Sequence, residues 1–338
     1  MHAEDLIIDT HAHLYPERFL DLIEDQKDKY PVQIVRNKEG LRVLIFYDRE
    51  FLIFHPNFYQ ADVRLAEMEA AGIDFQVLSL AMPMVYWADT ELGRDICQVY
   101  NDELAAVVRT HPDKFAALAA VPLQHPPSAV RELERAVKEL GMRGCIIGSN
   151  ISGRDLDAEE FEEFFAASAE LDAPIYIHPI MPAGIEKMGD YGLDVLLGFP
   201  LDTTLAAARI VFSGILERYP NLKIILSHLG GALPFLWGRL AKGSETFEGI
   251  ENRISGDVGE YFRMFYLDTI AYAPEVLAFG TRWIGPDKIV FGSDSPFFGV
   301  QNLRDCLSLV KDCPDLSQEE KRAILTETPK TVFMIDTI

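Results

Sequence analysis

The sequence is poor in basic residues, and this shortage excludes one large class of partner. Its 338 residues include 31 Lys and Arg against 53 Asp and Glu, for a formal net charge of −22. A nucleic-acid-binding domain needs a basic footprint, and anionic lipid would repel so acidic a surface. We therefore expect no nucleic-acid partner and no membrane partner.

Cysteines and long apolar runs are also scarce. The four cysteines are scattered and form no Cys-x-x-Cys pair, so neither a thiolate metal site nor a disulfide framework is expected. No run reaches the roughly 18 apolar residues of a membrane span. The first residues, MHAEDLIID, lack the basic and apolar regions of a signal peptide. These absences together predict a cytoplasmic protein.

A glycine-rich phosphate loop is missing after the first apolar segment. Such a loop usually follows the first strand of a doubly wound nucleotide-binding sheet. This chain has His-Ala-His-Leu at that point. The doubly wound sheet is therefore the less favoured of two architectures.

The favoured architecture rests on an alternation of strands and helices that is repeated eight times. Short apolar runs are separated by helical stretches and lie at 6–13, 75–81, 115–123, 144–150, 174–180, 223–231, 264–270 and 288–296. Apolar strands without polar alternation suit a parallel sheet that is covered on both faces. We predict an α/β fold, a (β/α)8 TIM barrel, formed as a single domain by residues 1–338.

Residues 14–60 interrupt this alternation as a small insertion after the first strand. Within them, VQIVRNKEGLRVLIF places turn residues 37–40 between two β-rich flanks. This pattern predicts a β-hairpin. The rest of the insertion reads as irregular.

Side chains that can bind a metal stand at the ends of the predicted strands. In the first strand, His11 and His13 share one face because side chains alternate along a strand. His178, His228 and Asp294 follow the fifth, sixth and eighth apolar runs. Barrel active sites are built at the carboxyl ends of the strands. Four histidines and an aspartate at one rim therefore predict a metal site.

The donor types narrow the choice of metal. Imidazole nitrogens with one carboxylate and an open position suit Zn²⁺, or another borderline divalent ion such as Co²⁺, Fe²⁺ or Mn²⁺. The fourth predicted strand, GCIIGSN, has no lysine or glutamate to bridge two ions. We therefore expect one Zn²⁺ per chain, with another divalent metal as the alternative.

These strand-end residues resemble the amidohydrolase superfamily, and the chain resembles its decarboxylase branch, the family of 2-amino-3-carboxymuconate-6-semialdehyde decarboxylase. The segments RLAEMEAAGIDFQVLS, VPLQ, SHLGGALPFLWGRL and FGSDSPF carry the resemblance over nearly the whole chain. It implies that His11, His13, His178 and Asp294 hold the metal. It also implies that His228 is catalytic, as general base or acid beside the open position, with Asp294 as the second catalytic residue.

Four residues are candidates for substrate binding. The resemblance matches Arg239 to an arginine that the family lends across a dimer interface to a substrate carboxylate, so a homodimer is expected. The family's second substrate arginine falls on Leu52 when the residues are counted without gaps. Arg49 is the nearest arginine, and His55, on the other side, is the alternative group for an anion. Met82 and Trp87, in the segment AMPMVYW, would form an apolar wall for a flat, conjugated substrate.

Together these residues predict a metal-dependent non-oxidative decarboxylase (carboxy-lyase) of a small unsaturated or aromatic carboxylic acid. A metal and an imidazole base also support hydrolysis. A hydrolase or hydratase of a small amide, lactone or unsaturated acid is therefore the alternative. A non-catalytic, zinc-stabilised binding protein is a second alternative, and a filled coordination sphere would favour it.

Overall fold

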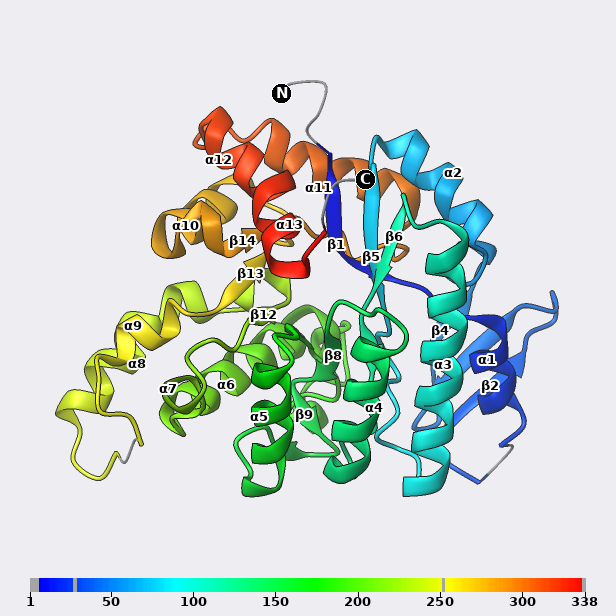
Figure 1. Ribbon diagram of the computed structural model, residues 1–338, viewed down its shortest axis with the longest axis horizontal. Coiled ribbons are helices and arrows are strands. Elements are labelled where there is room, and N and C mark those ends of the chain that lie inside the picture. Colours follow the sequence, from blue (N-terminus) through cyan, green and yellow to red (C-terminus); the bar gives the residue numbers. More distant parts are fainter. Residues whose placement is uncertain (1–5, 27–28, 251–252, 336–338) are drawn as a thin grey trace.

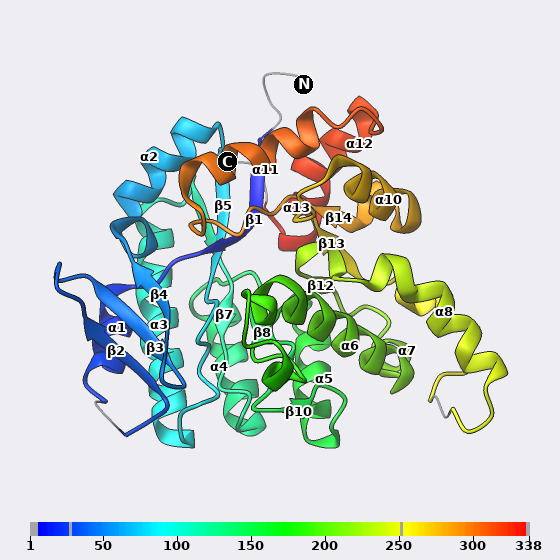
Figure 2. The same ribbon diagram turned by 180° about the vertical axis from the view of Figure 1, so that it is seen from behind.

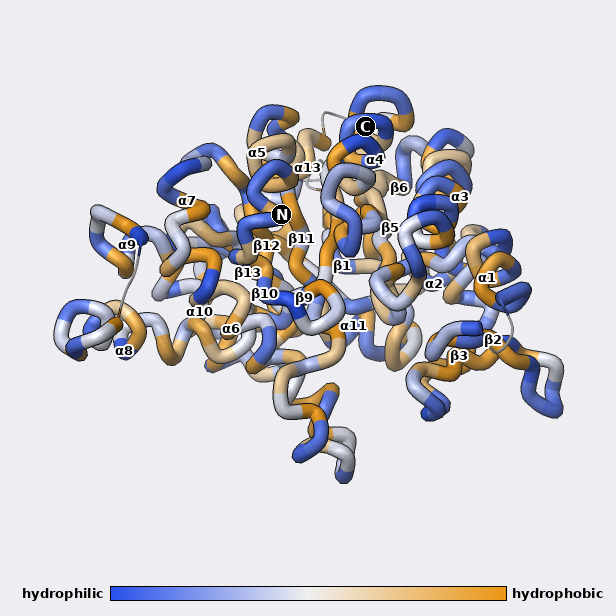
Figure 3. Tube along the Cα trace, turned by 90° about the horizontal axis from the view of Figure 1, so that it is seen from below, coloured by the Kyte–Doolittle hydropathy of each residue, from blue (hydrophilic) through white to orange (hydrophobic). Residues whose placement is uncertain are grey.

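The computed structural model of the chain describes residues 6–26, 29–250 and 253–335, and the predicted eightfold alternation forms a parallel barrel in it. The strands of the wall are β1 (Ile8–His13), β5 (Phe75–Ser79), β6 (Phe115–Ala117), β7 (Ala119–Ala120), β8 (Cys145–Gly148), β11 (Ile175–His178), β12 (Ile224–Leu226), β13 (Tyr266–Asp268) and β14 (Ile289–Val290). Nearly every residue in them is buried. Figure 3 shows the hydrophobic strands in the middle of the molecule and hydrophilic stretches around them.

Backbone hydrogen bonds close the wall at the two places where the sheet order is interrupted. The strands form two sheets, β1-β5-β6 and β14-β13-β12-β11-β8-β7. The third predicted strand splits at Leu118, whose N–H donates to Leu78 O at 2.9 Å. At the other place, His13 N donates to Ser295 O at 2.7 Å. The carboxyl end of β1 therefore lies beside the segment that follows β14.

Helices cover the outside of the barrel (Figures 1 and 2). One main helix follows each wall strand except β6, which runs directly into β7: α2 (Ala61–Ala71), α3 (Thr90–Thr110), α4 (Pro126–Lys138), α5 (Glu162–Glu170), α6 (Phe199–Phe212), α8 (Leu233–Thr246), α10 (Pro274–Ile284) and α11 (Gly299–Lys311). Shorter helices are α7 (Ile215–Arg218), α9 (Val258–Phe262), α12 (Gln318–Arg322) and α13 (Thr328–Phe333). Gly214, which has a φ of 77°, follows the C-cap of α6 and separates α6 from α7.

The insertion contains more regular structure than its sequence indicated. It begins with α1 (Glu17–Glu24) and continues as three antiparallel strands, β2 (Val32–Arg36), β3 (Arg42–Phe46) and β4 (Arg49–Phe54). At the turn between β2 and β3, the Asn37 side chain accepts hydrogen bonds from the N–H groups of Glu39 and Leu41. Figure 1 shows the insertion in blue beside α3. A small two-stranded ribbon, β9 (Asn150–Ile151) and β10 (Arg154–Asp155), follows β8.

One helical stretch, Asp194–Phe212, has the length and hydropathy of a membrane span, and 56% of it is buried inside the protein. It consists of a π-helical turn, Asp194–Gly198, followed by α6. Packing on the barrel accounts for the apolar residues on its inner side. Its outer side carries the exposed side chains of Leu197, Leu201 and Leu205, one on each successive turn.

Candidate metal centre and active site

Five side chains meet at the carboxyl end of the barrel. His11 and His13 lie on β1, His178 ends β11, and His228 and Asp294 follow β12 and β14. The ring centroids of His11 and His13 are 4.9 Å apart, and the His178 centroid lies 5.3 Å from His11 and 5.1 Å from His13. The structure therefore brings together all four predicted metal ligands and the predicted proton-transfer residue.

We call these five side chains the metal cluster, and Asp294 stands at its centre. Its Oδ1 lies 3.1 Å from His13 Nε2 and 3.3 Å from His11 Nε2, and its Oδ2 lies 3.6 Å from His228 Nε2. Burial alone would raise the pKa of Asp294, but the close approach of the three histidines holds it well below its usual range. The carboxylate is therefore ionised, as a metal ligand must be.

The donor set fits a divalent cation. One ligand atom from each of His11, His178, His228 and Asp294 lies within 4.8 Å of the other three. Among the described residues, the buried Nε2 atoms of His11 and His178 have no hydrogen-bond partner. A buried polar atom without a partner is rare and costly. A cation of the Zn²⁺ or Mn²⁺ class would satisfy both nitrogens.

His13 borders the same position from the side of β5. Its Nδ1 lies 3.1 Å from the Ser79 hydroxyl, while its Nε2 contacts Asp294. Burial lowers the pKa of the His13 imidazole to about 4, so the ring is neutral and offers a nitrogen lone pair. The four mutually close donor atoms include His228 and not His13. His13 adjoins this group through its contact with Asp294 Oδ1 at 3.1 Å.

Asp268, the last residue of β13, organises the site, although the sequence analysis did not single it out. It is fully buried and accepts hydrogen bonds from His11 Nδ1 at 2.7 Å and from the Tyr176 hydroxyl at 3.1 Å. The same carboxylate accepts the backbone N–H groups of His228 at 3.0 Å and Leu229 at 2.9 Å. With Nδ1–H donated to Asp268, His11 keeps Nε2 free for a metal. The signal was available, because the seventh apolar run, 264–270, carries two polar residues, Asp268 and Thr269, next to its end.

The backbone around the site is strained. His228, Leu229 and Asp294 have positive φ angles of 54°, 53° and 59°, in a region that residues other than glycine rarely adopt. Asp268 holds the first two through their N–H groups. Such residues concentrate at functional sites, where the surrounding structure enforces the conformation.

A buried polar network fixes the backbone of β1. Asp9 accepts hydrogen bonds from Ser293 Oγ at 2.6 Å and from Gln76 Nε2 at 2.8 Å. Arg64, fully buried on α2, donates to the carbonyl of His13 at 2.9 Å. Burial raises the pKa of Asp9 and lowers that of Arg64 to about 10. The network therefore positions the β1 strand, and the hydrogen bonds named here are not made to the imidazole rings of His11 and His13.

A cavity of about 720 Å³ opens beside the metal cluster. It is lined by His178, His228 and Asp294 of the cluster and by Arg49 from β4. Most of the remaining wall is apolar and includes Phe51, Leu52, Met82, Val195, Phe199, Ile270 and Phe297. Its size and lining suit a small aromatic or conjugated ligand.

Two of the four predicted substrate-binding residues, Arg49 and Met82, line this cavity. Trp87 lines a neighbouring cavity instead, and its Nε1 donates to Met84 O at 3.1 Å. The loop after β5 turns at Met84, which has a φ of 52°, and this turn separates Trp87 from Met82. Arg239 is exposed on α8 and lines neither cavity of its own chain.

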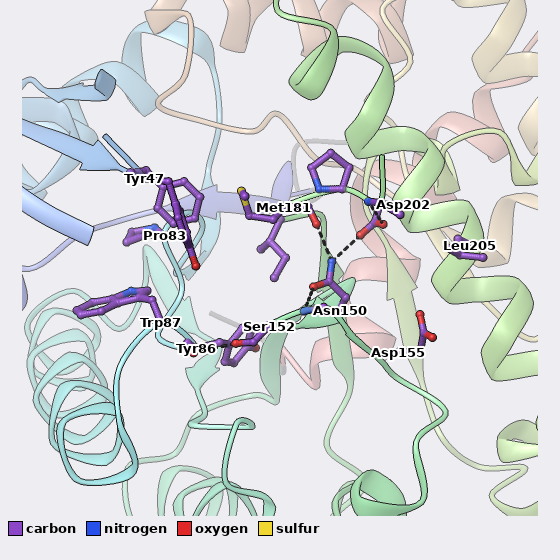
Figure 4. A pocket seen from close by; sticks show the side chains of 15 residues that line it. Tyr47, Pro83, Tyr86, Trp87, Asn150, Ser152, Asp155, Met181, Asp202 and Leu205 are labelled. Carbon is purple, nitrogen blue, oxygen red and sulfur yellow. Dashed lines mark hydrogen bonds between the residues drawn. The ribbon is translucent and has the colours of Figure 1, made fainter. Parts of the chain in front are cut away.

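Figure 4 shows the neighbouring cavity, which has a volume of about 390 Å³. Tyr47 and Trp87 lie on one side of it, and Asn150 and Asp202 lie on the other, with Met181 between them. Asn150 Nδ2 donates to Asp202 Oδ2 and to Met181 O, both at 2.9 Å. These polar groups bond to one another, and none of the metal cluster residues lines this cavity.

Comparison with known proteins decides the family. The chain matches the family model described as amidohydrolase over residues 8–335. The chain belongs to the amidohydrolase family. The match spans β1 to the residues after α13, so it includes every residue of the metal cluster.

Relatives of this amidohydrolase are decarboxylases. It is 33% identical over 300 residues to 2-amino-3-carboxymuconate-6-semialdehyde decarboxylase of Dictyostelium discoideum, covering 86% of this chain and 82% of the relative. It is 33% identical over 258 residues to gamma-resorcylate decarboxylase of Polaromonas sp., covering 72% and 79%. The solved 5-carboxyvanillate decarboxylase of Sphingomonas paucimobilis has a TM-score of 0.85 at 25% identity, covering 98% of this chain and 99% of that one.

A further structure bears on the metal. The dihydroxybenzoic acid decarboxylase of Polaromonas sp., solved with bound manganese, has a TM-score of 0.80 at 26% identity, and covers 99% of this chain and 98% of that one. The comparisons confirm the decarboxylase branch of the superfamily and the class of a metal-dependent, non-oxidative carboxy-lyase. With the metal cluster they also confirm a divalent metal site, without deciding the element.

Proposed function

We propose that this amidohydrolase removes CO₂ from a small aromatic or unsaturated carboxylic acid, with one divalent cation and His228 as proton donor. The observation that carries the proposal is the direct contact between the metal cluster and the apolar cavity of about 720 Å³. A non-catalytic protein stabilised by zinc would have its donor set enclosed. Here His178, His228 and Asp294 all line the cavity.

We assign His11, His13, His178 and Asp294 as the residues that would hold the cation. Three imidazoles and one carboxylate are typical zinc donors, so Zn²⁺ is the proposed native ion. The manganese in the Polaromonas relative supports a divalent ion and makes Mn²⁺ the alternative. Such a cation supplies Lewis-acid polarisation of an oxygen of the bound acid.

A residue of the chain supplies the proton that replaces CO₂ on the substrate. In the proposed reaction, the bond between the ring or vinyl carbon and the carboxylate carbon breaks, and its electron pair stays on the ring or vinyl carbon. CO₂ leaves, and a proton from His228 takes its place, so no oxidant is needed. Asp294 Oδ2, 3.6 Å from His228 Nε2, helps to position the imidazole. The apolar wall around Met82 and Phe297 limits access of water.

We also propose a homodimer in which Arg239 reaches the cavity of the partner chain. Phe235, one turn before Arg239 on the same face of α8, is 80% exposed. The start of α8 lies against α6, because Ala232 N donates to Thr204 Oγ1 at 2.8 Å. The outer side of α6 and of the π-helical turn before it presents the exposed leucines described above. A second copy of the chain would cover this apolar surface.

We further propose a cytoplasmic location. All four cysteines are buried free thiols in the structure. Unpaired thiols are typical of proteins from reducing compartments. Fractionation of the expressed, untagged protein tests this proposal, and recovery mainly outside the cytoplasm would contradict it.

The activity is tested by incubating the metal-loaded protein with aromatic and unsaturated acids, esters and lactones while CO₂ and products are measured. We expect CO₂ from at least one acid. His228→Ala should keep the metal and lose turnover by at least about a hundredfold, whereas His178→Ala should lose the metal. His111→Ala is the matched control, because His111 lines neither cavity. Hydrolysis of the esters or lactones without any CO₂ would contradict the proposal.

A further inference from the structure

The neighbouring cavity of about 390 Å³ is separated from the cavity beside the metal cluster by a thin partition. A smaller hollow of about 120 Å³ lies between the two cavities and shares lining residues with both. Met181 lines the hollow and the neighbouring cavity, and Met82 lines the hollow and the cavity beside the metal cluster. The three spaces therefore adjoin, with shared side chains between them.

The two methionines make this partition movable. A methionine side chain is unbranched and turns about three bonds. The hollow of about 120 Å³ is slightly smaller than the roughly 150 Å³ of a cavity that takes up benzene, so an aromatic ring would pass only when Met82 or Met181 changed its rotamer. The charged lining residues of the hollow, Arg49 and Asp194, pair with each other at 2.8 Å and add no net charge to this route.

The neighbouring cavity differs in charge from the cavity beside the metal cluster. None of its described lining residues is Lys, Arg or His, whereas Asp155 and Asp202 both line it. Asp155 is paired with Arg209 at 3.1 Å. Asp202 is only 6% exposed, and the hydrogen bonds that it accepts come from a neutral hydroxyl, a neutral amide and a backbone N–H. Such an uncompensated carboxylate in a poorly screened wall repels an anionic ligand.

The rest of this wall suits a flat, uncharged ring. Phe46, Tyr86 and Trp87 line it, and aromatic side chains pack well against another ring. Tyr47, which is 52% exposed, and the exposed Ser152 stand at its open side (Figure 4). The neighbouring cavity therefore joins the partition to solvent.

Decarboxylation changes the charge of the compound beside the metal cluster. The proposed reaction replaces a carboxylate by hydrogen, so the product carries one negative charge less than the acid. A bound cation and, in the proposed dimer, Arg239 of the partner subunit attract the acid, while Asp202 repels it from the neighbouring cavity. The product loses both the attraction and the repulsion.

We infer that the neighbouring cavity is a product site, which takes the decarboxylated aromatic or conjugated compound, and not the acid, on its way from the metal cluster to solvent. This inference rests on the proposed decarboxylation and adds a second binding site to it. Its physical basis is the difference in charge between two cavities that share a movable partition.

Two iodinated probes locate the binding sites in crystals of the metal-loaded protein. The uncharged 4-iodophenol represents the product, and the anionic 4-iodobenzoate represents the acid. Anomalous diffraction from iodine marks the position of each probe. We expect 4-iodophenol in the neighbouring cavity and 4-iodobenzoate only beside the metal cluster. The inference is overturned if 4-iodobenzoate occupies the neighbouring cavity or if 4-iodophenol is absent from it.

Blocking the neighbouring cavity tests the route in solution. Ala183 is exposed and lines this cavity but neither of the other two spaces, so Ala183→Trp should fill it. With the acid that gives the most CO₂ in the proposed assay, the rate of CO₂ release in the first turnover should stay within about twofold, while kcat should fall at least about tenfold because the product leaves more slowly. Ala66→Trp adds the same bulk at an exposed position of α2 that lines none of the three spaces, and it should keep both rates.

The outcomes separate the inference from the proposed function. An unchanged kcat in Ala183→Trp overturns the inference and leaves the proposed decarboxylation in place. Release of no CO₂ from any acid by the metal-loaded wild type contradicts the proposed function itself. If Ala183→Trp is unfolded by circular dichroism, or if its first turnover is slow, the positions of the two probes in the wild-type crystals decide.

Discussion

At the scale of single residues, the His11 ring is held by a carboxylate on one nitrogen and presents the other nitrogen to the metal cluster. Asp268 accepts the hydrogen bond from Nδ1 at 2.7 Å and also holds the N–H groups of His228 and Leu229. One buried carboxylate thus positions a proposed metal ligand and the proposed proton donor. Outer partners of this kind fix the tautomer and orientation of a ligand imidazole.

Replacing Asp268 with Asn tests this role. An amide cannot reproduce the carboxylate's pattern of acceptors, so we expect the metal affinity to fall by about 10- to 100-fold. Turnover should fall even at saturating metal, because His228 loses its support. Metal titration and steady-state kinetics measure the two effects separately. Asp287→Asn, at an exposed position, is the matched control. Unchanged metal affinity in Asp268→Asn would contradict the role.

Part of the site could be read from residue positions, and part could not. His11, His178, His228 and Asp294 were predictable because each stands near or just after the carboxyl end of an apolar strand, and the fold aims such positions at one rim. Trp87 was not predictable in the same way. The direction of the Trp87 side chain depends on the backbone turn at Met84, which has a φ of 52°. The spacing of residues in the sequence does not predict that turn.

At the scale of elements, the segment after β14 approaches β1 so closely that its glycine has no space for a side chain. A Cβ at Gly292 would lie 2.8 Å from His11 Cβ and 3.1 Å from Asp268 Cβ. We expect Gly292→Ala to displace the His11 ring and weaken metal binding at least about tenfold, although no ligand is removed. Metal titration measures this effect.

Gly189→Ala is the matched control, because a Cβ at Gly189 would meet nothing within 4 Å. It should leave metal affinity unchanged. Wild-type metal affinity in Gly292→Ala would show that the fit between these two segments does not set the position of His11.

The insertion is held to its own helix by charge. Glu24 of α1 accepts hydrogen bonds from Arg36 of β2 at 3.0 and 3.2 Å and from Arg42 of β3 at 3.3 Å. Burial would raise the pKa of Glu24, but the two arginines lower it below its ordinary value of 4.5. Because the pKa is lower in the folded state, this stabilisation is complete above about pH 4.5 and is lost as the pH falls below it.

Glu24→Gln should therefore destabilise the protein near neutral pH by roughly 0.5–1 kcal/mol, since the pair is partly solvated. The difference in melting temperature between the variant and the wild type should shrink as the pH falls from 7 to about 3.5. Glu39→Gln, in the exposed turn of the insertion, is the control and should show no such trend. A difference that stays constant with pH would rule out the charge interaction.

The elements themselves were predictable to different degrees. The wall strands are buried on both faces, so they are uninterrupted apolar runs in the sequence, and such runs predict strands. The helix α1 is only 8 residues long and has no side-chain N-cap, so it gives little signal in a sequence. β4 follows β3 after two residues, Tyr47 and Asp48, that both have positive φ, and neither is a glycine that would have marked a turn.

At the scale of the whole molecule, the proposed dimer places Arg239 of one chain in the cavity of the other. This arrangement predicts complementation between two inactive variants. Arg239→Ala and His228→Ala should each be inactive alone. After mixing and subunit exchange, half of the dimers are mixed, and each of these has one complete site. About a quarter of the wild-type activity should return.

Assembly is checked independently by sedimentation. Phe235→Glu introduces a charge into the proposed contact surface and should shift the protein to monomers, whereas Val35→Glu, at an exposed position on β2, should not. No recovery of activity after proven subunit exchange would show that Arg239 acts within its own chain or not at all.

The central claim is that separate strand ends deliver their donors to one cation. Anomalous diffraction from crystals of the metal-loaded protein, at the absorption edge of the added ion, tests it most directly. The account predicts one peak per chain at about 2.0–2.3 Å from the imidazole nitrogens of His11, His13 and His178 and from a carboxylate oxygen of Asp294. A peak elsewhere, or no peak at this rim in fully loaded protein, would contradict it.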